Sequence, residues 1–510
     1  MEHRHDSGTA PDAADKPRQM SLARKAGIYT VSRAVTILAQ IGALAILSRA
    51  LPKETAYAQL QFLLLVYGTA QVFGQLGLPD SIFYFFEKYP SEQRRSIVRF
   101  VSKILMWTAL FSAALFLGIG LFGTADAAYA GARPLLWMFM ALLVLELPTL
   151  PVPNVLIALD KARAAAWFNI FVGVTQFLAL TLPLLSAEPL YGISIGLLSY
   201  GVLRMAVSAA IYFLHMGAYP RIPLPAGFLR ELLYYSVPLS LAQLFWTLNR
   251  QIDKYVVKEF LPADTFAEYS NGAWELPIIP TIAYSVAAVM MPQMVAHFLK
   301  HENRALLELW LRSIKKVTVI VLPLVFVFLL GAEEFMVLLY SEKYRNSALP
   351  FSIYTLILLQ RVASYSNMLK ALNDTRAVTY SAIYLFAINA LLAVPFVLWL
   401  GVAGPPLASL IAQTFAWWYS LHVISKLLGV RFSETFPFGF YGKTLLVAIV
   451  AAAPFYFLKN HWELQPVLAF PVMAIGFLCL YFMLARASNI ITKADAQRIL
   501  KNITPGFFRR

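Results

Sequence analysis

Apolar runs of about 18 or more residues recur along the whole chain, and each is long enough to cross a bilayer as a helix. Of the 510 residues, 59% are hydrophobic and only 14% are charged. A water-soluble protein carries roughly a quarter charged residues, and one soluble core cannot enclose so many separate runs. The sequence therefore predicts an all-α polytopic membrane protein.

About fourteen membrane spans are predicted, joined mostly by short connections. They lie at residues 26–50, 55–78, 96–122, 133–159, 164–186, 190–216, 231–257, 264–296, 309–331, 348–371, 377–400, 403–427, 441–458 and 466–486. The predicted organisation is a disordered N-terminus at 1–22, an N-lobe of six helices at 23–216, a Pro-rich linker at 217–230, a C-lobe of six helices at 231–430, two extra helices at 431–486 and a basic tail at 487–510.

The formal net charge of +15 would indicate nucleic-acid binding in a soluble protein. In a membrane protein, Lys and Arg instead collect in cytoplasmic loops. With the N-terminus placed in the cytoplasm, most of the 42 Lys and Arg residues fall on the cytoplasmic side. The sequence therefore predicts that both termini and the linker are cytoplasmic, and it predicts no nucleic-acid partner.

The chain also contains an internal repeat. "NVLIALDKARA" at Asn154–Ala164 matches "NMLKALNDTRA" at Asn367–Ala377, 213 residues later. Two more pairs have nearly this spacing: "RFVSK" at Arg99 with "RSIKK" at Arg312, and "LPKET" at Leu51 with "LPADT" at Leu261. Six spans is an even number, so both copies enter the membrane in the same direction and are related by an axis along its normal. Two such lobes enclose a central space that suits alternating access.

Several charged residues lie deep within the predicted spans, where each costs at least ~2.5–3.5 kcal/mol on insertion scales. These residues are Arg33, Glu146, Arg204, Glu275 and Arg361. Arg33 is closest to a span end and can extend toward the cytoplasmic surface. Such charges usually face a bundle interior or a watery cavity, either paired or functional.

The seventh span carries the most charge. Trp246, Arg250, Asp253 and Lys254 follow the spacing i, i+4, i+7, i+8 and share one helical face. One interpretation is an amphipathic helix end at the outer surface, with Arg250 and Asp253 paired. The other is a polar stripe lining a cavity that accepts an anionic ligand.

The first span has a similar face, formed by Arg33, Thr36 and Gln40. The repeat places this span opposite the seventh, so two equivalent spans with polar stripes favour the cavity interpretation. Glu275 and Glu146 both lie close to prolines, which free backbone carbonyls in their spans. Asp253, Glu275 and Glu146 are the candidate ion-coupling or counter-charge residues, and the alternative for Glu275 is a salt bridge that fixes helix packing.

Sequence signatures of common enzymes are missing from the chain. It has no Walker A loop, HExxH, CxxC or GxSxG motif, its histidines form no ligand cluster, and Cys479 is its single cysteine. We therefore predict no enzyme activity and no bound cofactor or metal. Transport by this chain would be coupled to H⁺ or Na⁺ or follow a downhill gradient.

Three stretches resemble bacterial polysaccharide flippases of the multidrug/oligosaccharidyl-lipid/polysaccharide exporter superfamily. They are "SRALPKETAYAQLQFLLLVYGTAQVFGQLGLPDSIFYFF" from Ser48, "QIDKYVVKEFLPADTFAEYSNGAWELPIIPTIAYSVAAVMMPQM" from Gln251 and "GVAGPPLASLIAQ" from Gly401. The resemblance implies two six-helix lobes in a V, often with two extra helices, and movement of a polyprenyl-pyrophosphate-linked oligosaccharide to the outer leaflet. It also implies a cationic cavity, with Arg33, Arg250 and Lys254 at matching positions.

The expected function is thus a flippase of the bacterial inner membrane for surface polysaccharide, with the lipid bilayer and possible polymerase and glycosyltransferase partners. The candidate substrate-binding residues are Arg33, Gln40, Arg204, Trp246, Arg250, Lys254 and Arg361. Three alternatives stay open: an ion-coupled multidrug antiporter, a peptidoglycan-precursor flippase, and a membrane polysaccharide polymerase or glycosyltransferase. The last of these usually has a large extramembrane loop with catalytic residues, whereas the longest internal loop expected here is short.

Overall fold

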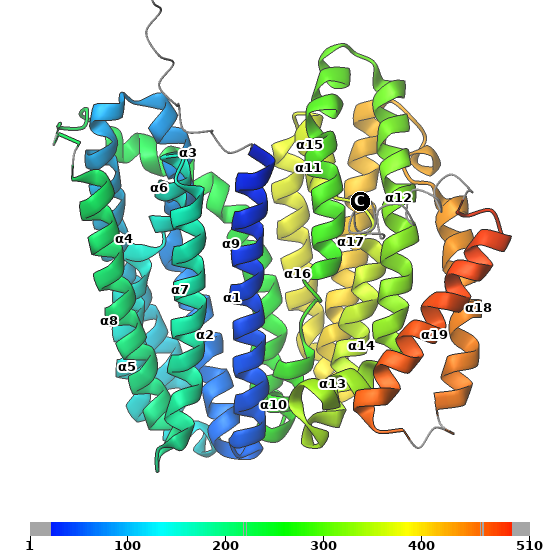
Figure 1. Cartoon of the computed structure of the whole chain (residues 1–510), viewed down its shortest axis with the longest axis horizontal. Helices are drawn as coiled ribbons and strands as arrows, with labels where there is room; N and C mark the ends of the chain where they lie inside the picture. The colour runs from blue at the N-terminus through cyan, green and yellow to red at the C-terminus, as the bar shows by residue number, and fades with distance from the viewer. Residues whose placement is uncertain (1–21, 218, 221, 460, 462–463, 492–510) are drawn as a thin grey trace, which may run out of the picture.

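The computed structural model describes residues 22–217, 219–220, 222–459, 461 and 464–491, and within this part the protein is helical throughout, without strands. Two helical lobes stand side by side, and a pair of C-terminal helices lies against the outer flank of the second (Figure 1). The all-α architecture predicted from the sequence is confirmed. The predicted disordered N-terminus and nearly all of the predicted basic tail fall outside the described residues.

The N-lobe is built from eight α-helices and several short turns. The helices are α1 (Leu22–Ala50), α2 (Ala58–Gln75), α3 (Leu78–Lys88), α4 (Arg94–Gly123), α5 (Leu136–Glu146), α6 (Val152–Ala158), α7 (Ala162–Thr181) and α8 (Pro189–Met216). The short elements are η1 (Lys53–Tyr57), η2 (Ser91–Gln93), η3 (Ala127–Leu135), η4 (Leu147–Thr149) and η5 (Leu182–Leu185).

The remaining helices form the C-lobe and its flanking pair. They are α9 (Phe228–Phe260), α10 (Ala263–Gly272), α11 (Ile278–Leu299), α12 (Asn303–Leu330), α13 (Ala332–Tyr340), α14 (Ala348–Ile357), α15 (Tyr365–Ala371), α16 (Thr375–Leu400), α17 (Gly404–Leu428), α18 (Phe438–Lys459) and α19 (Pro466–Ala487). The short elements are η6 (Glu342–Ser347), η7 (Leu358–Gln360), η8 (Gly401–Ala403) and η9 (Phe432–Glu434).

The predicted number of fourteen spans is not confirmed by length and composition. Ten stretches of the described residues are long and apolar enough to cross a membrane, or eleven if the bent helix α11 is counted as one span. One of the ten, Thr375–Leu428, contains both α16 and α17. The predicted seventh span, α9, carries many polar residues, and the predicted tenth is divided into α14 and α15.

The breaks within spans recur at equivalent places in the two lobes. Chain direction changes at Leu76 and Gly77, whose φ angles are 45° and 66°, and α11 bends by 43° at the matching point of the C-lobe. A second break follows Glu146, where Pro148 and Pro151 interrupt the helix, and its counterpart follows η7 at Arg361. The duplication seen in the sequence is therefore repeated in the local backbone.

The two lobes meet closely at one end, seen around α10 and α13 at the bottom of Figure 1. We call this the joined end: residues 48–61 of the N-lobe against 266–271 and 338–343 of the C-lobe. Here Gln61 Nε2 donates to Asn271 Oδ1 at 3.3 Å, and Tyr57 Oη donates to the same oxygen. Gln61 and Asn271 are 210 residues apart, the spacing of the "LPKET" and "LPADT" motifs. A contact between equivalent positions places them beside the pseudo-two-fold axis.

Cations close the rest of the joined end. The guanidinium of Arg49 donates to the carbonyl of Leu339 at 2.6 Å, at the C-terminus of α13, where exposed carbonyls favour positive charge. Lys343 Nζ returns a hydrogen bond of 3.1 Å to the carbonyl of Arg49, and Lys53 forms an ion pair with Glu268. Burial and the charge of Lys53 both lower the pKa of Lys343.

The long helix α9 packs on both lobes. Its first turns contribute Phe228 to a buried cluster with α3 and α4, so the helix begins within the predicted linker and on the N-lobe. There Glu231 accepts from Lys88 at 2.7 Å and from Tyr89 Oη at 2.6 Å. Farther along, α9 packs against α16 of the C-lobe. Pro238 lies inside the helix between these two regions.

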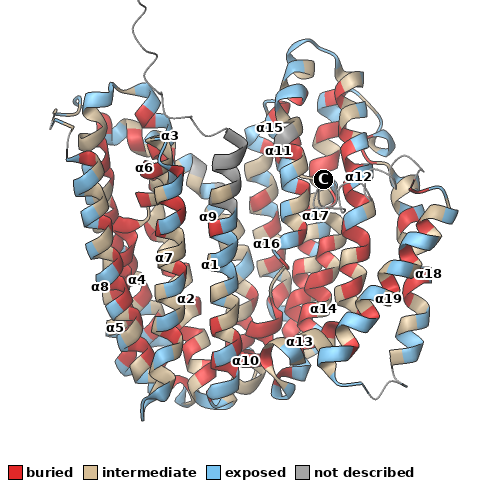
Figure 2. Ribbon diagram, in the orientation of Figure 1, coloured by how far each residue is buried: buried red, intermediate tan, exposed pale blue. Residues whose placement is uncertain are grey.

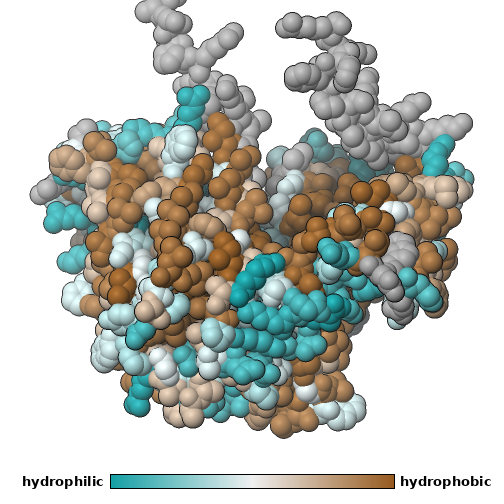
Figure 3. Space-filling model, turned by 60° about the horizontal axis from the view of Figure 1, so that its bottom comes forward, coloured by the Kyte–Doolittle hydropathy of each residue, from teal (hydrophilic) through white to brown (hydrophobic). Residues whose placement is uncertain are grey.

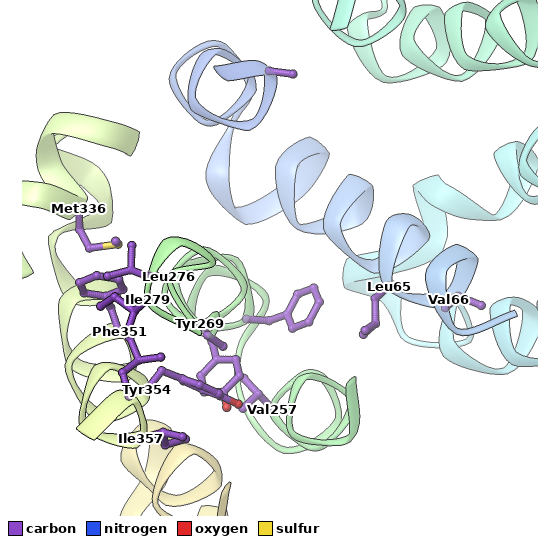
Figure 4. Packing of buried hydrophobic residues seen from close by; sticks show 14 of the residues in the cluster. Leu65, Val66, Val257, Tyr269, Leu276, Ile279, Met336, Phe351, Tyr354 and Ile357 are labelled. Carbon is purple, nitrogen blue, oxygen red and sulfur yellow. The ribbon is translucent and has the colours of Figure 1, made fainter. Parts of the chain in front are cut away.

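A single large apolar cluster runs from one lobe into the other. Figure 4 shows part of it, with Leu65 and Val66 of α2 on one side and Phe351 and Tyr354 of α14 on the other. Buried residues concentrate inside each lobe and along the joined end (Figure 2), while the outward faces of the helices are exposed. Those exposed faces are largely hydrophobic, as Figure 3 shows, which is the surface expected in contact with lipid.

We predict that Gly74→Val destabilises the N-lobe. A Cβ at Gly74 of α2 would lie 2.1 Å from Leu147 Cδ2 and 2.5 Å from Ser112 Oγ, so the larger side chain forces helices apart. Overpacking of this kind costs about 1–3 kcal/mol. Thermal unfolding of the detergent-purified protein should show a lower melting temperature. Gly118→Val is the matched control, because a Cβ there meets nothing within 4 Å; equal shifts in both variants would contradict the prediction.

Candidate functional site

A buried ion pair lies inside the N-lobe. Arg204 of α8 forms a salt bridge with Glu146, the last residue of α5, and donates to Tyr200 Oη at 2.8 Å. Tyr67 Oη of α2 donates to the other oxygen of Glu146. Arg204 is only 6% exposed. The prediction that Arg204 lines an open cavity is therefore not met, because its guanidinium is enclosed between three helices.

A second ion pair occupies the corresponding region of the C-lobe. Arg361, just after η7, binds Glu275 with two hydrogen bonds: Nη2 to Oε1 at 2.9 Å and Nε to Oε2 at 3.2 Å. Gln413 Oε1 of α17 accepts from the same Nη2 at 3.3 Å. The ring of Trp246 lies 5.0 Å from the guanidinium, within range of a cation–π contact. Glu275 is thus the partner of Arg361 and is not a counter-charge to Arg250 or Lys254.

The two copies of one predicted span carry opposite charges. The fourth predicted span supplies the acid Glu146, while its repeat counterpart, the tenth, supplies the base Arg361. A buried pair requires only that the two charges are opposite, since removing one partner leaves an uncompensated charge. The partners come from helices that are not equivalent in the repeat: Arg204 lies in the sixth predicted span, whereas Glu275 lies in the eighth, the counterpart of the second.

A third polar cluster joins α9 to the other helices of the C-lobe. Asp253 is fully buried, and its Oδ2 accepts from Tyr269 Oη of α10 at 3.1 Å and Ser409 Oγ of α17 at 3.3 Å. One turn earlier, Asn389 Nδ2 of α16 donates to Asn249 Oδ1 at 3.1 Å. Among the described residues, Asp253 Oδ1 and Asn389 Oδ1 are buried without a hydrogen-bond partner. The predicted Arg250–Asp253 pair is not formed.

The predicted polar stripe of α9 divides between three environments. With about 100° of rotation per residue, Arg250 and Lys254 lie about 60° and 100° from Asp253, and Tyr255 lies about 200° away. Asp253 faces the C-lobe, whereas Tyr255 Oη faces the N-lobe and donates to Thr69 of α2 at 2.9 Å. Arg250 and Lys254 therefore lie on the arc between the lobes, which we call the seam.

The seam residues differ from the members of the two ion pairs in lacking a hydrogen-bonded partner. Arg250 is exposed and Lys254 is half-buried. Neither makes a hydrogen bond or salt bridge with any other residue in the described part of the chain. Cations held at a lobe boundary without a protein partner are free to bind an anionic group.

The polar face of α1 is used mainly for packing against α7. Thr36 Oγ1 donates to the carbonyl of Asn169 at 2.9 Å, and Gln40 Nε2 donates to Gln176 Oε1 at 3.0 Å. Arg33 is exposed on the same helix. The structure thus separates the first-span candidates: Gln40 holds a neighbouring helix, and Arg33 remains available to solvent or lipid.

An aromatic-walled cavity of about 230 Å³ lies within the C-lobe beside the Arg361–Glu275 pair. Its lining includes Trp246, Tyr284, Arg361, Tyr365, Gln413 and Trp417. Of these, sequence reasoning selected only Trp246 and Arg361. Gln413 is the one amide side chain in the predicted span 403–427, which is the signal that could have identified it. No group of three His, Cys, Asp or Glu suited to a metal ion occurs among the described residues.

Fold and site together define a multi-pass membrane protein of the transporter type, with two parallel helical lobes. The chain belongs to the family described as polysaccharide biosynthesis protein, whose model matches residues 22–298, more than half of its length. This confirms the resemblance found in the sequence. A search of curated protein sequences finds no match.

Solved structures show the same fold at low sequence identity. Lipid II flippase MurJ in an inward closed conformation has a TM-score of 0.67 at 13% identity, covering 91% of this chain and 98% of that one. An inward-facing multidrug resistance MATE family transporter of the MOP superfamily has a TM-score of 0.64 at 15% identity, covering 79% and 98%. The two neighbours are named as a flippase and a transporter, and the likeness shows that this chain shares their fold.

We predict that Arg204→Met strongly destabilises the protein. The substitution leaves Glu146 buried without its ion-pair partner, which typically costs about 3–5 kcal/mol. Thermal unfolding in detergent should show a large fall in melting temperature for this variant. The double variant Glu146→Leu/Arg204→Met removes both charges and should recover most of the loss. A double variant no more stable than Arg204→Met would show that the pair is not the source of the effect.

Proposed function

We propose that this protein is a flippase that moves a polyprenyl-pyrophosphate-linked oligosaccharide across the bacterial inner membrane for surface polysaccharide synthesis. Three observations support the proposal: membership of a polysaccharide biosynthesis family, a fold shared with a lipid flippase, and two unpartnered cations in the seam. The seam cations carry the most weight, because they lie between the lobes and make no hydrogen bond or salt bridge in the described part of the chain.

In this proposal the seam holds the anionic diphosphate of the substrate. The planar guanidinium of Arg250 can donate two parallel hydrogen bonds to phosphate oxygens, and Lys254 adds a compact positive charge nearby. Arg33, exposed near the predicted cytoplasmic end of α1, extends the path for the anion. The lipid tail stays in the bilayer while the lobes alternate between openings to the two sides. The buried pair Glu146–Arg204 and the half-buried pair Glu275–Arg361 fix neighbouring helices within each lobe.

The orientation follows from the distribution of Lys and Arg. The N-terminus, the linker and the C-terminus are placed in the cytoplasm, so the joined end closes the outer side. A polymerase and glycosyltransferases acting before and after translocation are the expected partners. Lipid-linked oligosaccharide should therefore accumulate on the cytoplasmic side in a strain that lacks the protein.

We predict that Arg250→Ala/Lys254→Ala abolishes surface polysaccharide without lowering the amount of protein in the membrane. Both side chains lie in the seam without a protein partner, so their removal costs substrate binding rather than folding. Polymer is measured on the cell surface, and protein level is measured by immunoblot of membranes. Arg312→Ala/Lys316→Ala removes two exposed cations elsewhere and should leave polymer unchanged. Normal polymer in the seam variant would exclude this site.

Ion coupling is assigned to the cluster around Asp253. Its free carboxylate oxygen and the free Asn389 Oδ1 are acceptors with no donor in the described structure, which suits a proton or a small cation such as Na⁺. An ion bound in this cluster would contact α9 itself, the helix that also carries Arg250 and Lys254. Changes in the cluster can therefore alter how the seam is presented to substrate.

We predict that Asp253→Asn removes stimulation of transport by an ion gradient but leaves substrate binding in place. The amide has the same shape but loses the negative charge that attracts the ion. Proteoliposomes with a Na⁺ or a pH gradient report the stimulation, and the gradient that loses its effect identifies the ion. Ser285→Ala in α11, another polar residue of the C-lobe, serves as a control. Full gradient stimulation in Asp253→Asn would exclude the cluster as the coupling site.

A further inference from the structure

A groove of about 700 Å³ lies outside both lobe interiors, between the start of α4 and the linker that follows α8. Arg95 Nη1 donates to the carbonyls of Gly217 and Tyr219, both at 3.1 Å, and Ser96 Oγ donates to the carbonyl of Ile222 at 2.5 Å. These bonds hold the linker across the beginning of the helix. The groove is therefore built by specific contacts between its two walls.

The α4 wall of the groove is cationic. Arg95, Arg99 and Lys103 follow one another at four-residue intervals, over about 12 Å of helix. Arg99 and Lys103 are exposed and make no hydrogen bond or ion pair with the rest of the described chain. No acidic residue is among the residues that line the groove. The positive charge along this wall thus lacks a counter-charge from the protein.

The opposite wall of the groove is apolar, formed by linker residues such as Ile222, Pro223 and Leu224. Below Lys103 the same stripe of α4 continues as Trp107 and Phe111, which are 65% and 63% exposed. Cations followed by an exposed Trp and then by exposed apolar side chains mark the passage from lipid head groups to the hydrocarbon region. The groove therefore opens toward lipid as well as toward water.

The equivalent groove of the C-lobe has a different charge balance. It lies between the start of α12 and the segment after α17, and its cations Arg304 and Lys315 are accompanied by Glu308 and Glu434. Arg312, which the repeat aligns with Arg99, forms an ion pair with Glu308 at 3.3 Å. The two copies share the groove, but an uncompensated cationic wall is found only in the first of these two.

We propose that the α4–linker groove binds an anionic phospholipid of the bilayer. Its phosphate is held by Arg99 and Lys103, and its acyl chains lie along Trp107 and Phe111. Basic pockets beside membrane helices recognise anionic head groups in this way. Since the linker joins the two lobes, a bound lipid ties α4 to the segment through which the lobes are connected. The site is separate from the seam, and its occupancy is measured without any transport assay.

The test compares lipid binding by the full-length, detergent-purified protein and its variants in native mass spectrometry. The unmodified protein should retain phosphatidylglycerol at least tenfold more tightly than Arg99→Gln/Lys103→Gln, and should discriminate against zwitterionic phosphatidylethanolamine. The charge-preserving Arg99→Lys/Lys103→Arg should bind as the unmodified protein does. Arg312→Gln/Lys316→Gln removes the same charge at the repeat-equivalent position and should also bind normally.

Two results would overturn the proposal. One is equal phosphatidylglycerol binding by the unmodified protein and Arg99→Gln/Lys103→Gln. The other is stabilisation by a soluble anion: inorganic phosphate, at the same phosphate concentration as the lipid, raising the melting temperature as much as phosphatidylglycerol does. If the Gln variant unfolds on purification, the charge-preserving variant decides the outcome, because loss of lipid binding there excludes a phosphate site based on charge.

Discussion

Charge in a low-dielectric interior must be compensated, and this constraint organises the whole molecule. Glu146 meets Arg204 inside one lobe, and Arg361 meets Glu275 inside the other. One member of each pair, Glu146 or Arg361, lies at a break in its helix. Each ion pair connects the segment at a helix break to a neighbouring helix. The pairs therefore help each lobe to move as one rigid body. Two cations outside these pairs, Arg250 and Lys254, lie between the lobes.

Contacts between the two lobes differ from the ion pairs within each lobe. Apart from the apolar cluster, the joined end is closed by a few hydrogen bonds, such as Arg49 to the carbonyl of Leu339 and Gln61 to Asn271, and by the Lys53–Glu268 pair. Polar contacts of this type exchange readily with water, as in interfaces between mobile domains. Because the contact between Gln61 and Asn271 lies beside the pseudo-two-fold axis, the lobes approach each other symmetrically there.

Much of the fold was predictable from periodic apolar runs and from the repeat, because lipid leaves the backbone few options besides helices. The partners of charged residues were not predictable, since Glu146 and Arg204 are brought together by tertiary packing alone. The prolines after Glu146 signalled one break in the sequence, but the break at Arg361 has no proline beside it. The sequence predicted one polar face on α9. In the structure the residues of that face lie in different environments, because the two lobes contact the helix from different sides.

The helix α9 carries the cations of the seam and also contacts both lobes, so it would respond to movement of one lobe relative to the other. Its first turns are fixed to the N-lobe through Glu231, and its later turns contact the C-lobe through Asp253 and the N-lobe through Tyr255, so it cannot follow either lobe alone. Any change in the spacing of the lobes must be absorbed between these attachments. Pro238 lies in that interval and lacks the N–H that would complete the helical ladder, so bending there costs less than elsewhere. Arg250 and Lys254 lie beyond this point, where α9 contacts the C-lobe through Asp253 and α2 of the N-lobe through Tyr255, so a change in the spacing of the lobes would act directly on the seam.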